Sequence, residues 1–237
     1  MWSGPRNLST ALMRAFENRG DTAVWDEPFY ACYLSVTGSD HPGAAEVIAA
    51  GETDWRRVVE RLTGKVPGNR AVYFQKHMTH HLLPSIDRCW MDDVENCFLI
   101  RDPRQVIASY SRIRDEVAAD DVGIAQQAEI YDHVVSRCPR APLVLDARDL
   151  LENPRRMLSA LCERLGIAFT ESMLSWPPGP RPSDGVWARH WYRSVRESTG
   201  FKTHVPTAHR LPAHLEPLAR ESERHYRRLW RHRLTEK

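Results

Sequence analysis

The chain has 237 residues, of which 33 are Lys or Arg and 31 are Asp or Glu, so its formal net charge is +2. A chain of this length can bury a sizeable core, and a single domain is the default expectation. The near-neutral charge argues against a bulk nucleic-acid binder, which would be strongly basic. No apolar run approaches the roughly 20 residues of a membrane helix. Residues 4–7 also interrupt any apolar core of a signal peptide at the start.

The five cysteines are scattered along the chain, and no CxxC spacing occurs among them. An odd, scattered set favours free, buried thiols over a disulfide framework or a cysteine metal site. We therefore expect a cytoplasmic protein without a bound metal.

The first element is a short loop that runs into an amphipathic helix, within the stretch WSGPRNLSTALMRAF at residues 2–16. Apolar residues recur there at the spacing of one helical face, at Leu8, Ala11, Leu12, Ala15 and Phe16. Gly20 is a natural stop. Only Met1 and Trp2 precede the loop, so either the strand before it is very short or the natural chain begins upstream.

The next segments alternate between strands and other structure. Residues 22–25 predict a short strand, and residues 38–52, rich in Gly, Ala, Pro and acidic residues, predict an exposed loop or insertion. Residues 53–63 predict a helix, and residues 71–77 predict a strand with polar residues at its end. Residues 96–102 predict a buried strand that ends in a charged pair.

The second half continues the alternation. Asp102 caps a helix with Pro103 at its first position, and a long helix is expected over roughly 119–137. A strand follows at 142–147, and Asn153 caps a further helix. Strands that alternate with helices predict an α/β fold with a mostly parallel sheet and helices on both faces. Ligands bind such sheets at the carboxyl ends of the strands, so the polar residues at strand ends are the candidates for a site.

The residue composition changes at residue 176. Residues 176–210 are dense in Pro, Gly, Trp and Arg, and we expect them to form an ordered, irregular lid over a core of residues 1–175. A final helix over about 213–233, within a C-terminal segment 211–237, ends in the basic run RHYRRLWRHR. Acidic residues precede that run, so we interpret it as a solvated helix face rather than a nucleic-acid or membrane patch.

The opening loop carries the first chemistry. Unpaired backbone N–H groups at a helix start, together with the helix dipole, attract anions. Arg6 adds a positive charge with bidentate geometry, and Asn7, Ser9 and Thr10 add donors, which predicts a site for a phosphate-like group. The loop lacks the lysine of a nucleoside triphosphate loop. An alternative is that Asn7 or Ser9 only caps the helix.

A second candidate lies in IRDPRQVIASY, at residues 100–110. Arg101 stands where a strand ends, and Ser109 lies seven residues beyond Asp102, about 10 Å along a helix that rises ~1.5 Å per residue. The two residues could hold a second, separate phosphate. Alternatively, Arg101 pairs with a carboxylate and Ser109 packs as a small helix residue.

Together the two segments resemble the sulfotransferase family, whose donor is 3′-phosphoadenosine-5′-phosphosulfate. The likeness covers about residues 1–165 and implies a P-loop NTPase-like, three-layer α/β/α fold. It implies that the 5′-phosphosulfate is held by the first motif, Pro5, Arg6, Asn7, Leu8, Ser9 and Thr10. Arg101 and Ser109, eight positions apart, would hold the 3′-phosphate. No metal would be needed, because a sulfuryl donor has no β and γ phosphates to bridge.

The resemblance also implies a catalytic base and a basic contact to the sulfonate. Glu27, after the strand at 22–25, matches a glutamate that some family members use as general base, although Asp26 or Glu27 could instead only cap the next helix. Lys76 aligns with the lysine of a Lys-Thr-His stretch and could contact the sulfonate, but His77 follows it directly. The base therefore stays open between Glu27 and a histidine such as His77.

Two further interpretations concern histidines and the lid. Zinc bound by the histidines of QKHMTHH is disfavoured, because His80 and His81 are adjacent and no cysteine is near in sequence. The family closes over the adenosine with a C-terminal Arg/Lys-Gly segment, for which Arg196 and Gly200 are the candidates here, beside Arg193 and Lys202.

The sequence thus favours a sulfotransferase acting on a hydroxyl or amine of a small-molecule acceptor, in which Arg6 stabilises charge on the leaving phosphate. Two alternatives remain: an ATP-dependent small-molecule kinase, and a nucleotide-binding protein that has lost transfer. We expect neither nucleic acid nor membrane as a partner, and a homodimer is one assembly open to the chain.

Overall fold

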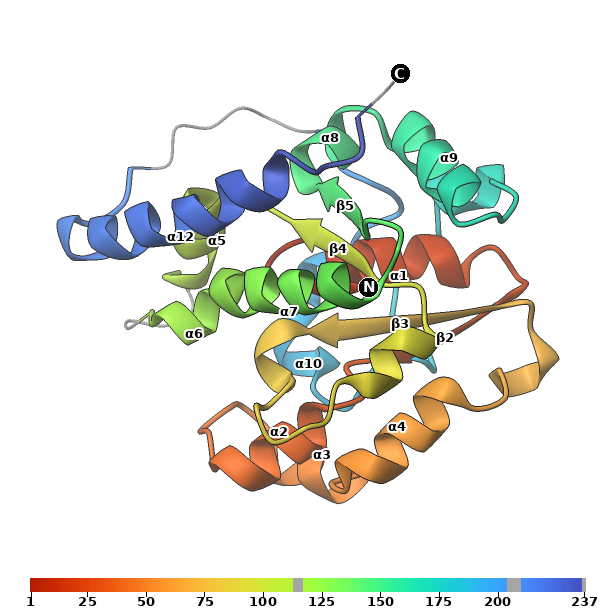
Figure 1. The fold of residues 1–237 in the computed structure, drawn as a ribbon, viewed down its shortest axis with the longest axis horizontal. Coiled ribbons are helices and arrows are strands. Elements are labelled where there is room, and N and C mark those ends of the chain that lie inside the picture. Colours follow the sequence, from red (N-terminus) through yellow and green to blue (C-terminus); the bar gives the residue numbers. More distant parts are fainter. Residues whose placement is uncertain (113–116, 204–209, 236–237) are drawn as a thin grey trace. The chain divides into compact units, whose positions relative to one another are not determined.

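The computed structural model describes residues 1–112, 117–203 and 210–235 (Figure 1). The chain forms two compact units, each assembled from segments that are distant in sequence. Unit 1 comprises Met1–Ser9, Glu95–Phe169 and Lys202–Lys237. Unit 2 comprises Thr10–Val94 and Thr170–Phe201.

Three parallel strands form the centre of unit 1. β1 (Trp2–Ser3) pairs with β4 (Cys97–Ile100), and β4 pairs with β5 (Leu143–Asp146). Within the given sequence, the strand before the opening loop comprises two residues. Trp2 lies opposite Phe98, and both side chains are buried. The buried apolar run of β4 is what a strand with neighbours on both sides requires.

The helices of unit 1 follow the predicted order, with one correction. They are α5 (Pro103–Tyr110), α6 (Ala119–Val122), α7 (Ile124–Arg137), α8 (Ala147–Glu152), α9 (Pro154–Arg164) and α12 (Glu216–Trp230), the last preceded by a 3₁₀ turn, η5 (Ala213–Leu215). The single helix predicted over 119–137 is wrong. Gly123 adopts φ +70° between α6 and α7, a left-handed conformation that ends one helix before the next begins.

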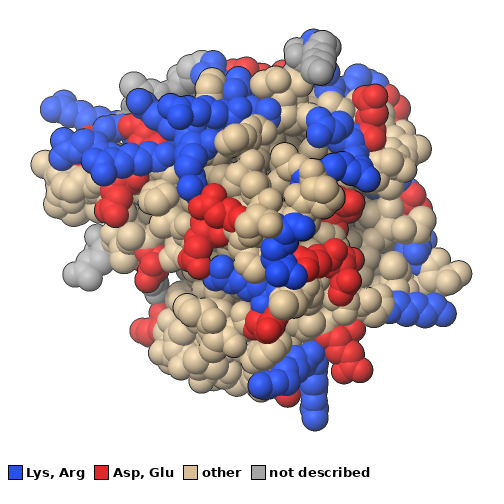
Figure 2. Space-filling view, viewed as in Figure 1, with Lys and Arg blue, Asp and Glu red and all other residues tan. Residues whose placement is uncertain are grey.

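The basic run of the final helix lies on the outside of unit 1. α12 packs along α5 and α7, and Figure 2 shows Lys and Arg side chains gathered over it. Several of these arginines have acidic neighbours: Arg227 pairs with Glu223 at 2.7 Å and Arg228 with Asp132 at 2.9 Å. In the described part of the chain, no helix is both long enough and apolar enough to span a membrane.

Unit 2 is built around a parallel pair of strands. β2 (Thr22–Asp26) and β3 (Val72–Met78) run side by side, with Asp26 opposite Lys76 at their carboxyl ends. The surrounding helices and turns are α1 (Ser9–Glu17, which begins at the unit boundary), α2 (Tyr30–Thr37), α3 (Ala44–Ala50), α4 (Trp55–Thr63), η1 (Pro67–Asn69), η2 (Thr79–His81), η3 (Cys89–Asp93), η4 (Glu171–Leu174), α10 (Ala188–Trp191) and α11 (Arg193–Arg196).

The loop predicted over 38–52 is wrong in its centre, because α3 forms there. Val47 of α3 is buried against Tyr30, Ala31 and Leu34 of α2, so tertiary packing gives this Ala-rich stretch a covered face.

The predicted α/β class with mostly parallel strands is confirmed in both units. The predicted irregular segment 176–210 holds only the short helices α10 and α11 as far as residue 203, and its residues 204–209 lie outside the described residues.

Candidate active site

The loop between β1 and α1 has an unusual backbone. Arg6 and Leu8 adopt φ values of +62° and +68°, which residues with side chains rarely do. When left-handed and right-handed backbone conformations alternate along a loop, successive N–H groups point towards one side and form a concave anion site. Strained conformations of this kind persist where function requires them and the surrounding structure holds them.

The surroundings of the loop in unit 1 hold that conformation. Asn7 Nδ2 donates to the carbonyl of Leu99 at 3.2 Å, and Gln127 Nε2 donates to the carbonyls of Trp2 and Leu99 at 3.0 Å each. A Cβ at Gly4 would lie 2.4 Å from the carbonyl oxygen of Val122, so only glycine fits there. Asn7 Oδ1 is buried without a hydrogen-bond partner.

Two arginines meet at this loop. Arg6 Nε donates to Ser109 Oγ at 3.0 Å, and Arg101 Nη1 donates to the carbonyl of Arg6 at 2.7 Å. Arg101 Nε also donates to Gln105 Oε1 at 3.1 Å. The residues assigned to two separate phosphates therefore form one cluster, in which Arg6 reaches from the first motif to Ser109 of the second.

Within the described residues, no carboxylate forms an ion pair with Arg6 or Arg101, although the more distant Asp102 and Asp146 partly offset the charge of Arg101. Burial lowers the pKa of both guanidiniums, and the charge of Arg6 lowers the pKa of Arg101 further. Two partly buried cations that repel each other gain most from a bound anion. Pro5, Leu8 and Thr10 are half-buried and Ser9 is buried, so these residues line the turn into α1.

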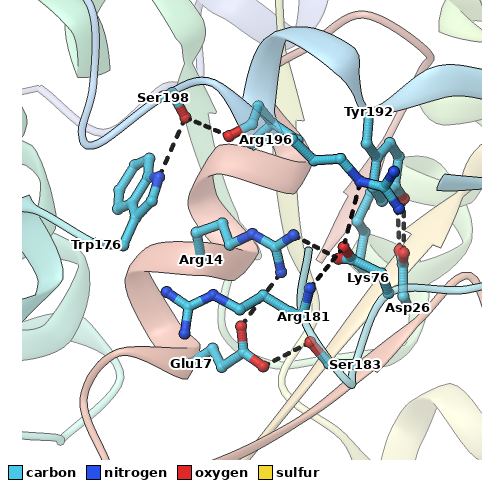
Figure 3. A network of polar contacts seen from close by, with 12 residues as sticks. Arg14, Glu17, Asp26, Lys76, Trp176, Arg181, Ser183, Tyr192, Arg196 and Ser198 are labelled. Atoms are coloured by element: carbon cyan, nitrogen blue, oxygen red, sulfur yellow. Dashed lines mark hydrogen bonds and ion pairs between the residues drawn. The ribbon is translucent and has the colours of Figure 1, made fainter. Parts of the chain in front are cut away.

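A second cluster forms in unit 2, where Lys76 is almost completely buried. Lys76 Nζ donates to Asp26 Oδ1 and to the Tyr192 hydroxyl, each at 2.8 Å (Figure 3). It also donates to Glu27 Oε1 at 2.5 Å. An ammonium group has three hydrogens, so all of them are used within the cluster. Lys76 can contact another group, such as the predicted sulfonate, only by giving up one of these bonds.

The four groups leave one carboxylate oxygen without a hydrogen bond. The Tyr192 hydroxyl donates to Asp26 Oδ2 at 2.6 Å, so both oxygens of Asp26 have a partner. Glu27 Oε1 accepts from Lys76, and no hydrogen bond joins Glu27 Oε2 to any described residue. The helix that follows has Phe29 as its N-cap, so neither carboxylate caps it.

Burial determines the titration of this cluster. It raises the pKa of Glu27, an effect that Lys76 opposes and Asp26 reinforces. It works against the charge of Lys76 too, but Asp26 and Glu27 outweigh it and raise the pKa of Lys76. Burial and the two carboxylates hold the pKa of Tyr192 well above its usual value, so its phenol stays a neutral donor. With both carboxylates ionised, the cluster carries one net negative charge.

The histidines of η2 and β3 are neutral. His81 Nδ1 is buried without a hydrogen-bond partner and lies 3.9 Å from Glu27 Oε2. His77 packs against the rings of Phe29 and Trp90, and its Nε2 lies 3.4 Å from Gln75 Oε1. Burial lowers the pKa of His77 and His81 well below the usual value, and that of His80 to about 3. Within the described residues, no group of His, Cys, Asp and Glu has the arrangement of a metal site.

Of the predicted lid residues, Arg193, Arg196 and Gly200 belong to unit 2, whereas Lys202 belongs to unit 1. Arg196 Nε is buried and lies 3.9 Å from Asp184 Oδ2, while the carbonyl of Arg196 accepts from the N–H of Gly179 at 2.7 Å. Gly200 bridges to Ser175, and a Cβ there would lie 2.9 Å from the carbonyl oxygen of Leu174. Their predicted contact with an adenosine stays a prediction.

Comparison with known proteins decides the family. The sequence profile of the sulfotransferase domain matches residues 1–213. The chain belongs to the sulfotransferase family.

Two solved sulfotransferase domains share the fold. The domain of the Synechococcus PCC 7002 olefin synthase is 19% identical with a TM-score of 0.50, covering 93% of this chain and 92% of that one. The domain of the curacin biosynthetic pathway is 16% identical with a TM-score of 0.51, covering 97% and 95%. The predicted P-loop NTPase-like α/β fold agrees with these likenesses.

Two Arabidopsis thaliana proteins are similar over 202 residues: branched-chain-amino-acid aminotransferase-like protein 2, at 36% identity, and protein 1, at 37%. The match covers 85% of this chain but only 36% of each plant protein. This sulfotransferase-family chain thus spans about a third of the length of those relatives.

Sequence reasoning missed part of the second cluster. The sequence suggests a helix cap for Asp26 and leaves His81 among the histidines that could be a base or, less favourably, a zinc ligand, and it does not distinguish Tyr192. A sequence signal existed for Asp26, because it ends a strand next to Glu27. None existed for Tyr192, which lies among several aromatic residues and more than a hundred positions from Lys76.

Proposed function

We propose that the protein transfers a sulfuryl group from 3′-phosphoadenosine-5′-phosphosulfate to a hydroxyl or amine of a small-molecule acceptor. The observation that carries this proposal is the Arg6–Arg101–Ser109 cluster beside a loop of alternating backbone hand. Its two guanidiniums, which form no ion pair within the described residues, suit a ligand with phosphate groups at more than one position. Membership of the sulfotransferase family selects the sulfuryl donor among such ligands.

The proposed reaction is an in-line displacement at sulfur. A bond forms between the acceptor oxygen or nitrogen and sulfur, and the bond between sulfur and the oxygen of the 5′-phosphate breaks. The acceptor proton goes to Glu27 Oε2, and the electron pair of the broken bond stays on the phosphate. Arg6 and the loop N–H groups stabilise the charge that develops there, so the transfer needs no metal ion.

Glu27 is the better candidate for the base. Its Oε2 is without a hydrogen bond, and burial raises the pKa of the carboxyl towards the range in which a base works best. Burial moves the pKa of His77 in the opposite direction, which makes its imidazole a weaker base. His81 Nδ1, 3.9 Å from Glu27 Oε2, is placed to orient an acceptor group that binds to that oxygen.

A thermal-shift experiment tests the donor site. Adenosine 3′,5′-bisphosphate without metal should stabilise the protein by about 2.7 kcal/mol at a hundredfold excess over its dissociation constant. Adenosine 5′-phosphate, which lacks the 3′ group, should stabilise it less. If ATP with magnesium stabilises the protein and the bisphosphate does not, the proposal is wrong and the kinase alternative replaces it.

A transfer assay with the 35S-labelled donor and a panel of phenols, alcohols and amines tests the reaction itself. Labelled product should form in the presence of EDTA. Tight binding of the bisphosphate without transfer to any acceptor would instead favour a protein that binds the nucleotide and has lost the activity.

A further inference from the structure

Asp26, Glu27, Lys76 and Tyr192 form the second cluster, which we call the acid cluster, and the Tyr192 hydroxyl contacts the other three residues. This hydroxyl donates to Asp26 Oδ2 at 2.6 Å, accepts from Lys76 Nζ at 2.8 Å and lies 3.2 Å from Glu27 Oε1. We propose that Tyr192 is a positioning residue that holds Lys76 and Asp26 in the arrangement that keeps Glu27 ready to accept a proton. The inference rests on the proposed role of Glu27 as the base.

The count of hydrogens in the cluster shows why the hydroxyl is needed. Lys76 has three N–H groups and three acceptors, and Tyr192 provides one of these. Asp26 Oδ2 has Tyr192 as its donor. Without the hydroxyl, one N–H of Lys76 and one oxygen of Asp26 lose their partners in a buried site, and such groups are costly to leave unpaired.

Tyr192 reaches the cluster from a segment remote in sequence. We call residues 176–201 the strap. A buried ion pair attaches the strap to α1 within unit 2: Arg14 Nη2 lies 2.5 Å from Asp184 Oδ1, and these side chains are only 1% and 3% exposed. Figure 3 shows Arg14 beside Glu17 and Ser183. Ser183 Oγ also donates to Glu17 Oε1 at 2.5 Å. The strap that carries Tyr192 is therefore fastened at a point separate from the cluster.

Within the strap, Trp187 supports Tyr192. Trp187 Nε1 donates to the Tyr192 hydroxyl at 3.3 Å, and its ring forms a T-shaped contact with Tyr30 at a centroid distance of 5.2 Å. Tyr30 in turn stacks on His81, with centroids 4.4 Å apart. The strap thus contacts Glu27 directly through Tyr192. It is linked to His81 indirectly, because Trp187 packs on Tyr30 and Tyr30 stacks on His81.

The sign of the effect follows from the groups around Glu27: Asp26 from β2, Lys76 from β3, His81 from η2 and Tyr192 from the strap. His81 is neutral. Loss of the tyrosine hydroxyl leaves Asp26 less stabilised as an anion, so Asp26 competes more strongly for Lys76. Glu27 then loses part of its counter-charge, and its pKa rises. A hydrogen bond to a charged group corresponds to a change of about one pH unit or more.

The primary test is Tyr192→Phe, with Tyr73→Phe on β3 as a matched control outside the cluster. The Glu27 carboxyl is titrated by 13C NMR in the protein without donor or acceptor. The Glu27 midpoint should move up by about one pH unit in Y192F and stay unchanged in Y73F. In the transfer assay, the acidic limb of kcat should move in the same direction, while KM for the donor stays near the wild-type value. An unchanged Glu27 midpoint in folded Y192F overturns the inference.

Two further variants keep the test decisive. Trp187→Phe keeps the hydroxyl but removes the N–H that donates to it, so the midpoint should move in the same direction by less. A double-mutant cycle of Y192F with Asp26→Asn should be non-additive, because Tyr192 acts through Asp26. Additive shifts contradict that route, and if Y192F does not fold, an unchanged midpoint in W187F overturns the inference.

The NMR titration needs neither substrate, so it separates the two proposals. A wild-type protein that transfers no sulfuryl group, but shows the Y192F shift, refutes the proposed function and leaves the coupling of Tyr192 to Glu27 intact. If the wild-type protein transfers the sulfuryl group but the Glu27 midpoint is unshifted in Y192F, the proposed function is supported and the coupling of Tyr192 to Glu27 is refuted.

Discussion

The two clusters differ in how they balance their charges. In unit 1, Arg101 donates to the carbonyl of Arg6 and Arg6 donates to the Ser109 hydroxyl, and no described carboxylate lies at ion-pair distance from either guanidinium. In unit 2, Lys76 is saturated by two carboxylates and a phenol. A cationic site that lacks its counter-charge gains from an anionic ligand, whereas a cluster that is paired internally already has its geometry before any ligand binds. The first arrangement suits binding and the second suits proton transfer.

The largest expected effect tests the proton-transfer side of this comparison. Glu27→Gln removes the base and should lower kcat about 10²–10⁴-fold, because general base catalysis contributes that much. The dissociation constant of adenosine 3′,5′-bisphosphate, measured by calorimetry, should change little. Glu60→Gln, on the exposed surface of α4, is the control. A kcat near wild type in E27Q would show that another group accepts the proton.

The next effect concerns the buried attachment of the strap. Asp184→Ala leaves Arg14 buried without its closest partner and should lower the free energy of unfolding by about 3 kcal/mol or more. Glu197→Ala breaks the exposed pair with Arg193 and should cost at most about 1 kcal/mol. Urea unfolding of both variants measures the difference. Equal losses would mean that the strap is not fastened through Asp184.

The binding side is tested by Arg101→Ala. Loss of one charge-assisted contact to phosphate, worth about 1.5–3 kcal/mol, should raise the dissociation constant of the bisphosphate about 10- to 100-fold. Arg148→Ala removes an exposed arginine of the same unit that pairs with Glu152, and should leave the affinity unchanged. Similar affinities of R101A and the wild type would remove Arg101 from the nucleotide site.

The smallest effect is a pH dependence of stability. The pKa of His77 in the folded protein lies well below the value of about 6.5 in an unfolded chain. Its contribution to stability is therefore complete above pH 6.5 and is lost as the pH falls. Between pH 7 and 5.5 the loss should be about 1 kcal/mol.

His77→Gln should reduce the fall in stability between those pH values by that amount, in urea unfolding curves recorded at both. The variant also tests the alternative base. If folded H77Q transfers no sulfuryl group, the base is His77 rather than Glu27.

Local spacing was sufficient for most of the elements. The apolar periodicity of residues 8–16, the capped helix after Asp102 and the buried strand at 96–102 all rest on neighbours within a few positions, and each is present in the structure. Where a local pattern was ambiguous, tertiary contacts decided. The Ala-rich stretch at 38–52 became helical at α3 because α2 covers one of its faces, and Gly123 divided a helix whose apolar pattern continues across it.

The candidate site divides in the same way. By itself the sequence determined the α/β class, the family and the identity of Arg6, Arg101, Ser109, Glu27 and Lys76 as candidates, because these depend on residue type and spacing. Only the tertiary structure decided that Arg6 reaches Ser109, that Lys76 has no hydrogen left to donate, and that Tyr192 completes its set of partners. Such pairings join residues about 50 to 116 positions apart, and no local pattern encodes a hydrogen bond across that distance, because folding and not sequence proximity brings the two atoms together.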